Sequence, residues 1–234
     1  MHNSIKASVF FRIAKAVLFS LLLLLLSACG KGVKITEIDN SYETESQLAT
    51  VQIPQISGLA SKDLENAVND EFTTVTNELL NKFSEAAKKT GEKSRFEMQT
   101  TEYFNKSGLL SMVTDYEYFA RKSHKSRFRI AKNIDTEGCI ELSLSDLFED
   151  DGYIDALNAM LFYAVAAEPE KYADLWAKPK IMQNQGFYID GENLVLYYPP
   201  YELSYYERGF VEIPVPIEEL LTYMRPEYRE VFMD

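Results

Sequence analysis

The sequence is poor in the residues that most often build catalytic and metal sites. It contains only two cysteines and two histidines in 234 residues. Cys139 is the only cysteine after Cys29, so the chain beyond residue 29 has no intramolecular disulfide. We expect Cys139 to be a buried, inert thiol. A zinc site of the usual cysteine and histidine type lacks ligands here, so the sequence predicts no metal site and no cofactor.

Histidine is equally scarce, which removes most designs for catalysis by proton transfer. His124 is the only histidine beyond residue 2, and it lies in a basic stretch, residues 121–127, that we expect to be an exposed loop. Positive neighbours disfavour a protonated imidazole there, and a Ser-His-Asp triad could use no other histidine. Nothing marks a catalytic carboxylate pair among the 36 acidic residues. We predict that the protein is not an enzyme, with a carboxylate-only wall-sugar hydrolase as an alternative.

The chain has fewer basic than acidic residues in total. The sequence has 24 lysines and arginines against 36 aspartates and glutamates, which gives a formal net charge of −12 at pH 7. This balance excludes nucleic acid as a partner, because the phosphates would be repelled. It also argues against side-chain binding to an anionic membrane surface. The excess of acid serves either solubility or the attraction of a basic partner.

The first 29 residues contain the clearest local pattern. An uncharged apolar run over residues 16–26 follows three basic residues, Lys6, Arg12 and Lys15, and precedes Leu26-Ser27-Ala28-Cys29. This order of a basic, an apolar and a small-residue segment is typical of a secretory signal peptide. The run is shorter than the roughly 20 residues that a transmembrane helix needs. A cysteine directly after the cleavage site is the lipobox of bacterial lipoproteins.

We therefore predict that residues 1–28 are a lipoprotein signal peptide and that Cys29 carries a thioether-linked lipid. The alternatives are an ordinary cleaved secretory signal and an uncleaved anchor. Removal of residues 1–28 would leave 206 residues with a net charge of about −15, because three basic and no acidic residues would be lost. We expect an extracytoplasmic protein, anchored by lipid at the cell surface or the periplasmic face. Residues 29–46 are polar and predict a lipidated tether that precedes the domain.

The chain from residue 47 to 135 is predicted to form a strand, a long helix and then further strands. Residues 48–56 are predicted to form a strand that ends or lies at an edge near Pro54. Ser61 is an expected N-cap, and a helix-spaced apolar stripe follows it, ending before Gly91: Leu64, Val68, Phe72, Val75, Leu79 and Phe83. Alternating patterns predict antiparallel strands over residues 95–104, 109–119 and 127–134.

Residues 136–234 are predicted to contain a second helix and a hairpin. The acidic stretch 149–152 lacks the ligand spacing of a calcium loop, and a helix is expected over residues 153–167. Asp190-Gly191 lies between strands 186–189 and 194–198, which is a strong hairpin pattern. A tyrosine-rich bend, a strand over 210–213 and a short helix over 217–224 complete the prediction. The fold class is α+β, with an antiparallel meander packed against the long helix of the N-terminal half, a second helix and a C-terminal hairpin.

Several segments resemble known envelope proteins. Residues 142–148, 187–189, 194–203 (LVLYYPPYEL) and 209–220 (GFVEIPVPIEEL) are similar to the C-terminal extracytoplasmic domain of RsiV-type anti-sigma factors. Residues 51–59, the helix containing Asn69 and residues 108–111 are similar to the domain that precedes it. That domain also occurs in the non-catalytic N-terminal region of PdaC-type peptidoglycan deacetylases. The resemblance covers about residues 47–224, and we expect subdomains over residues 47–135 (PdaC-like) and 136–234 (RsiV-like).

The resemblance implies an α+β envelope module that has no chemistry of its own. In the RsiV family this region binds lysozyme, whereas the present sequence has no sigma-binding segment and no deacetylase domain. We therefore predict a binding or sensing module for a basic protein such as lysozyme, or for cell-wall glycan. The alternative is an accessory lipoprotein that scaffolds another envelope protein. The candidate ligand-binding residues follow the second strand of the C-terminal hairpin: Tyr201, Glu202, Tyr205, Tyr206 and Glu207.

Overall fold

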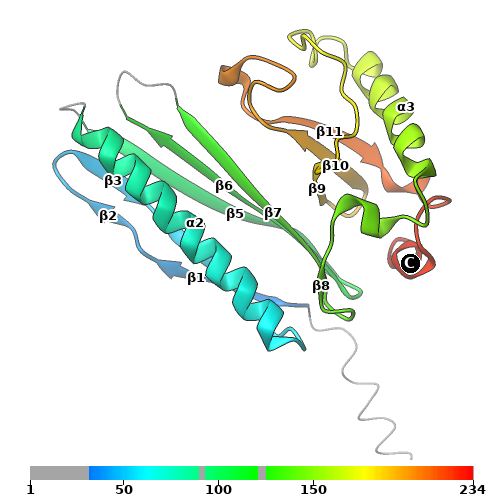
Figure 1. The fold of residues 1–234 in the computed structure, drawn as a ribbon, viewed down its shortest axis with the longest axis horizontal. Helices are drawn as coiled ribbons and strands as arrows, with labels where there is room; N and C mark the ends of the chain where they lie inside the picture. The colour runs from blue at the N-terminus through cyan, green and yellow to red at the C-terminus, as the bar shows by residue number, and fades with distance from the viewer. Residues whose placement is uncertain (1–31, 90–92, 121–124, 234) are drawn as a thin grey trace, which may run out of the picture.

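The computed structural model describes residues 32–89, 93–120 and 125–233, which form two lobes. Figure 1 shows a long sheet covered by one helix beside a smaller sheet covered by another. We call the described parts of residues 32–141 the first lobe and residues 142–233 the second lobe. Cys29 and His124, for which the sequence made predictions, lie outside the described residues.

The first lobe contains eight strands and the long helix. Its elements are β1 (Lys34–Asp39), β2 (Tyr42–Glu43), β3 (Gln47–Thr50), β4 (Gln52–Ser57), α2 (Lys62–Lys88), β5 (Ser94–Lys106), β6 (Leu109–Phe119), β7 (Ser126–Asp135) and β8 (Ile140–Glu141). Six strands form one sheet in the order β2-β3-β5-β6-β7-β8, in which only the β3–β5 pair is parallel. Strands β1 and β4 form a separate antiparallel pair.

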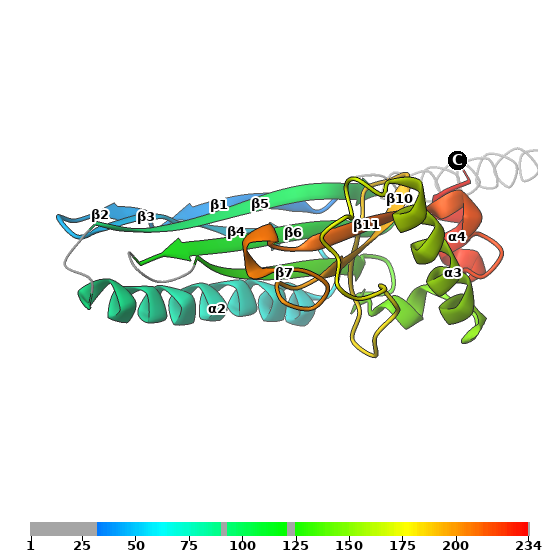
Figure 2. The same cartoon turned by 90° about the horizontal axis from the view of Figure 1, so that it is seen from above.

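Helix α2 lies along the large sheet, as the apolar stripe predicted (Figure 2). The Ser61 side chain accepts a hydrogen bond from the Leu64 backbone N–H, so the expected N-cap is confirmed. The stripe residues Val68, Phe72 and Phe83 are buried against the sheet. At 27 residues the helix is about 40 Å long, which matches the long strands β5 and β6 that it covers.

The second lobe contains a three-stranded antiparallel sheet and two helices. Its elements are the 3-10 turn η1 (Leu144–Leu147), α3 (Gly152–Ala167), β9 (Gly186–Ile189), β10 (Asn193–Tyr198), η2 (Tyr206–Arg208), β11 (Val211–Pro216), η3 (Ile217–Glu219) and α4 (Pro226–Val231). The sheet order is β11-β10-β9, so the predicted hairpin is confirmed. Phe104 and Leu109 of the β5–β6 hairpin are buried in the core of this lobe.

Four sequence predictions differ from the structure. Residues 34–39 and 42–43, expected within the tether, are strands β1 and β2, because their backbone groups pair with β4 and β3. The predicted strand 48–56 is two strands that join different sheets around the buried Val51. The predicted helix 217–224 is a single 3-10 turn followed by turns. Cys139 is half-buried, in a turn with φ +55°, rather than fully buried.

A polar network joins the two sheets where β9 lies beside β6 and β7. Ser111 Oγ donates to Asn133 Oδ1 at 2.7 Å and accepts from the Ile189 backbone N–H at 2.8 Å. Asn133 Nδ2 donates to the Phe187 carbonyl at 3.0 Å. The free edge of β9 is thus paired by side chains instead of by another strand, which holds the lobes in a defined orientation.

Candidate functional site

Two loops of the second lobe are tied together on its surface. One loop follows α3 (residues 168–185), and the other follows β10 (residues 199–210). The Trp176 backbone N–H donates to the Leu203 carbonyl at 3.0 Å, and the indole Nε1–H of Trp176 donates to the Glu202 carbonyl at 3.3 Å. Asp174 accepts from Ser204 Oγ at 2.7 Å and forms an ion pair with Arg208. These bonds fix the loops relative to each other.

The tied loops expose three large aromatic side chains, which we call the aromatic face: Trp176, Tyr201 and Tyr205. Their exposed fractions are 50%, 60% and 61%. The rings of Trp176 and Tyr205 meet edge to face with their centroids 5.1 Å apart. Tyr201 has φ +74° and its ring lies 5.0 Å from that of Tyr206. Exposed aromatic side chains held in place are the typical anchors of protein interfaces.

The structure places the predicted site residues in one loop but gives them different surroundings. Tyr201 and Tyr205 are exposed, whereas Glu202 is half-buried and its pKa is raised because burial disfavours the charged carboxylate. The Tyr206 hydroxyl accepts a hydrogen bond from the Arg127 backbone N–H at 2.9 Å, so this tyrosine links the loop to β7. The Glu207 side chain is exposed, and its backbone carbonyl accepts from Arg127 Nη1 at 3.1 Å.

Trp176 is the member of the aromatic face that sequence reasoning missed. It lies 25 residues before Tyr201, and no periodicity or turn pattern marks it. It also lines an apolar groove of about 560 Å³ beside α3, together with Phe162, Val165, Leu175 and Pro179. The only indication in the sequence was that a tryptophan stands in a segment with no predicted strand.

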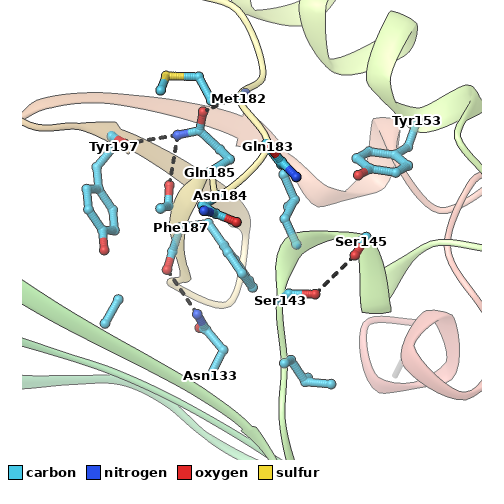
Figure 3. Close-up of a pocket in the computed structure, with 14 residues that line it drawn as sticks. Asn133, Ser143, Ser145, Tyr153, Met182, Gln183, Asn184, Gln185, Phe187 and Tyr197 are labelled. Carbon is cyan, nitrogen blue, oxygen red and sulfur yellow. Dashed lines mark hydrogen bonds between the residues drawn. The ribbon is translucent and has the colours of Figure 1, made fainter. Parts of the chain in front are cut away.

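A second concave feature is a cleft of about 430 Å³ between the lobes (Figure 3). It is lined from four parts of the chain: β7, the segment around η1, the start of α3, and the residues around β9 and β10. Gln185 forms part of its wall and is fully bonded, because its Nε2 donates to the carbonyls of Gly186 and Tyr197 and its Oε1 accepts from the Met182 N–H. A Cβ on Gly186 would lie 2.4 Å from the Tyr197 ring, so only glycine fits beneath that ring.

Metal-ligand clusters and membrane-spanning helices are both absent among the described residues. Among them no group of three or more histidine, cysteine, aspartate or glutamate side chains is arranged to hold a metal ion. Within the same described ranges, none of the helices has the length and apolar character needed to cross a membrane.

Comparisons with known proteins match the two halves of the chain to different families. Residues 40–124 match a family model described as Deacetylase PdaC, and residues 145–218 match one described as Protein of unknown function (DUF3298). Over 212 residues the chain is 27% identical to the anti-sigma-V factor RsiV of Bacillus subtilis (strain 168). The aligned region covers 80% of this chain and 69% of RsiV. The chain resembles RsiV. The resemblance that the sequence motifs predicted is therefore confirmed.

Two crystal structures share the fold. A member of the DUF3298 family from Bacteroides fragilis NCTC 9343 aligns with 87% of this chain and all of its own length, at a TM-score of 0.64 and 17% identity. A DUF3298 family protein from Pseudomonas aeruginosa PAO1 aligns with 85% of this chain and 95% of its own, at a TM-score of 0.57 and 13% identity. At these identities the likeness concerns the fold alone, and it confirms the predicted α+β class.

Proposed function

We propose that this protein is a non-enzymatic, extracytoplasmic binding or sensing module that captures a basic protein, such as lysozyme, on its aromatic face. The observation that carries the proposal is the exposure of Trp176, Tyr201 and Tyr205 on two loops that are bonded to each other. The resemblance to an anti-sigma factor supports a sensing or binding role over a catalytic one.

The distribution of charge supports a basic partner. The chain has a net charge of −12, and Glu202 and Glu207 lie in the same loop as Tyr201 and Tyr205. An acidic field raises the association rate of a basic protein, and desolvated aromatic contacts then slow its dissociation. The apolar groove beside Trp176 is a surface on which a protein partner could bury apolar side chains. It therefore also fits the alternative role, in which the module scaffolds another envelope protein.

Reversing the two loop carboxylates is the direct test of charge recognition. We expect hen lysozyme to bind the full-length chain in calorimetry at about 0.15 M salt, where long-range attraction is largely screened. The double variant that combines Glu202→Lys and Glu207→Lys should weaken this binding by about tenfold or more, because positive charges then face the basic partner. The matched control reverses Glu78 and Glu85, two exposed acids on α2, and should change the affinity by less than about threefold.

Two outcomes would contradict this function. Lysozyme binding that disappears at physiological salt would indicate generic attraction to an acidic protein. An equal loss of affinity in the loop variant and the α2 variant would indicate that net charge, and not the aromatic face, determines binding. Circular dichroism of each variant establishes that the fold is retained.

We also propose that the lipid on Cys29 seats the first lobe close to the membrane. Gly32 packs against Asn105, since a Cβ on Gly32 would lie 2.6 Å from the Asn105 Oδ1. The next residue, Val33, is bonded to the same side chain through both its N–H (2.9 Å) and its carbonyl (2.7 Å). Only three residue steps separate Cys29 from Gly32, which span about 10 Å at most. Residues 32 and 33 therefore lie against the end of β5, where Asn105 stands.

Replacing Cys29 tests the anchor. Cys29→Ser should shift the protein from the membrane fraction to the aqueous phase of a detergent partition, and should remove the lipid mass from the intact protein. Cys139→Ser is the matched control, because it removes the other cysteine and should leave the anchor in place. A Cys29→Ser protein that still carries lipid would exclude this attachment site, and the lysozyme experiment is independent of that result.

A further inference from the structure

The cleft between the lobes has a lining without charge. About one residue in four of this chain is charged, yet none of the 14 residues around the cleft is. Its polar groups are hydroxyls and carboxamides instead, and its apolar groups include Met182, Leu142 and Phe187. A phosphate or a carboxylate would find no cation there to offset its desolvation. The lining therefore favours an uncharged ligand that both donates and accepts hydrogen bonds.

One buried side chain in this cleft has an unused hydrogen-bonding group. Tyr153, at the start of α3, is 7% exposed and stacks on Phe148 with the ring centroids 4.2 Å apart. Among the described residues its hydroxyl has no hydrogen-bond partner, and Figure 3 shows the hydroxyl directed across the cleft toward Gln183. Among the described residues, Arg229 Nε is the only side-chain nitrogen or oxygen that is buried without a partner, so the Tyr153 hydroxyl is open to the cleft and can bond to a ligand there.

The rim of the cleft adds groups of the same kind. Gln183 and Asn184 are exposed, and their carboxamides make no hydrogen bond within the described parts of the chain. Ser143 and Ser145 lie across the cleft with their hydroxyls 3.0 Å apart, and Ser143 Oγ already donates to Asp146 Oδ2 at 2.6 Å, so the Ser145 hydroxyl is the better placed of the two to meet a ligand. Carboxamides offer one acceptor and two donors each, which complement the amide of an acetamido group as well as sugar hydroxyls.

We propose that the cleft binds an uncharged, N-acetylated oligosaccharide, with the Tyr153 hydroxyl and the Gln183 carboxamide hydrogen-bonding to the sugar. The volume of about 430 Å³ lies within the range of small-ligand sites. The apolar side chains of Met182 and Phe187 would contact the acetyl methyl group and the ring face. This site is separate from the aromatic face and does not depend on the binding of a basic protein.

Titration with chitotriose tests the site. The full-length chain is purified in a detergent that has no sugar headgroup, and binding is followed by calorimetry and by saturation-transfer NMR. We expect saturable binding with a dissociation constant at or below about 1 mM. Maltotriose has the same hydroxyl-rich character without acetamido groups and should bind at least about tenfold more weakly. A triglycine peptide, which carries a carboxylate, should not bind.

Tyr153→Phe locates the site, because it removes the hydroxyl and keeps the ring that stacks on Phe148. This variant should lose about three- to tenfold in affinity for chitotriose, as expected for one neutral hydrogen bond. Tyr163→Phe on the same helix, whose side chain lies outside the cleft, should bind like the wild type. Gln183→Ala provides a second, exposed variant that leaves the core intact.

Three results would overturn the proposal. They are no binding of chitotriose up to about 10 mM, binding that Tyr153→Phe and Gln183→Ala both leave unchanged, and binding of triglycine in preference to chitotriose. The last result would assign the cleft to a peptide. None of these outcomes bears on lysozyme binding at the aromatic face, so the two proposals can fail separately.

Discussion

Replacement of Arg129 by alanine is expected to lower the free energy of unfolding by about 3 kcal/mol. The Arg129 side chain is 7% exposed and bridges the lobes. It binds both carboxylate oxygens of Asp115 on β6, at 2.6 and 2.8 Å, and Glu212 on β11 at 2.5 Å. Its guanidinium also lies over the rings of Tyr197 and Phe210, at 5.1 and 4.4 Å.

The size of this effect follows from what the substitution leaves behind. Burial by itself would lower the pKa of Arg129, but the hydrogen bonds and charges of Asp115 and Glu212 outweigh it and raise the pKa. Without the guanidinium, two carboxylates from different lobes would face each other unpaired. Both are partly exposed, and solvent reduces the cost, which places the expected loss at the lower end of the range for buried pairs.

Chemical denaturation measures this prediction. Arg129→Lys keeps the positive charge but cannot form the bidentate pair with Asp115. The stability of this variant should therefore lie between those of the wild type and Arg129→Ala. Arg95→Ala is the control, because Arg95 is largely exposed and its pair with Glu97 should contribute less than about 1 kcal/mol. If Arg129→Ala and Arg95→Ala were equally stable, the ion pairs of Arg129 would not stabilise the contact between the lobes.

Replacement of Trp176 by alanine is expected to weaken lysozyme binding by about 30-fold, which corresponds to about 2 kcal/mol. Trp176 contacts Tyr205 edge to face and hydrogen-bonds to the Tyr201-containing loop through its backbone and its indole. Its loss would remove an aromatic anchor and would also loosen the second loop of the aromatic face. The dissociation rate should therefore rise more than the association rate falls.

Two further variants test whether the loss of affinity comes from the aromatic contact itself. Trp176→Phe keeps an apolar ring without the indole N–H and should recover part of the affinity. Tyr223→Ala removes a partly exposed aromatic side chain outside the aromatic face and should bind lysozyme like the wild type. Wild-type affinity in Trp176→Ala would exclude the aromatic face as the binding surface and would leave the scaffold role as the better explanation.

The fold was predictable wherever local pattern and burial agree. Helix α2 followed from one apolar stripe and an N-cap, and the β9–β10 hairpin followed from Asp190-Gly191 between apolar runs. The prediction was wrong where pairing partners decide the conformation. Polar residues 34–39 form β1 because β4 offers a complementary edge, and α4 forms at residues 226–231 beside Leu147 and Phe148, which are far away in sequence.

The sequence by itself determined the local features of this protein: its predicted lipidation signal, its acidity, its scarcity of cysteine and histidine, and most of its helices and strands. These depend on residue type and on spacing over a few positions. Only the tertiary structure decided the two candidate sites, the aromatic face and the cleft between the lobes. Trp176 joins the tyrosines through bonds between loops, and the cleft collects side chains from four segments. These residues become neighbours through packing between distant parts of the chain. Such packing produces no periodic pattern in the sequence.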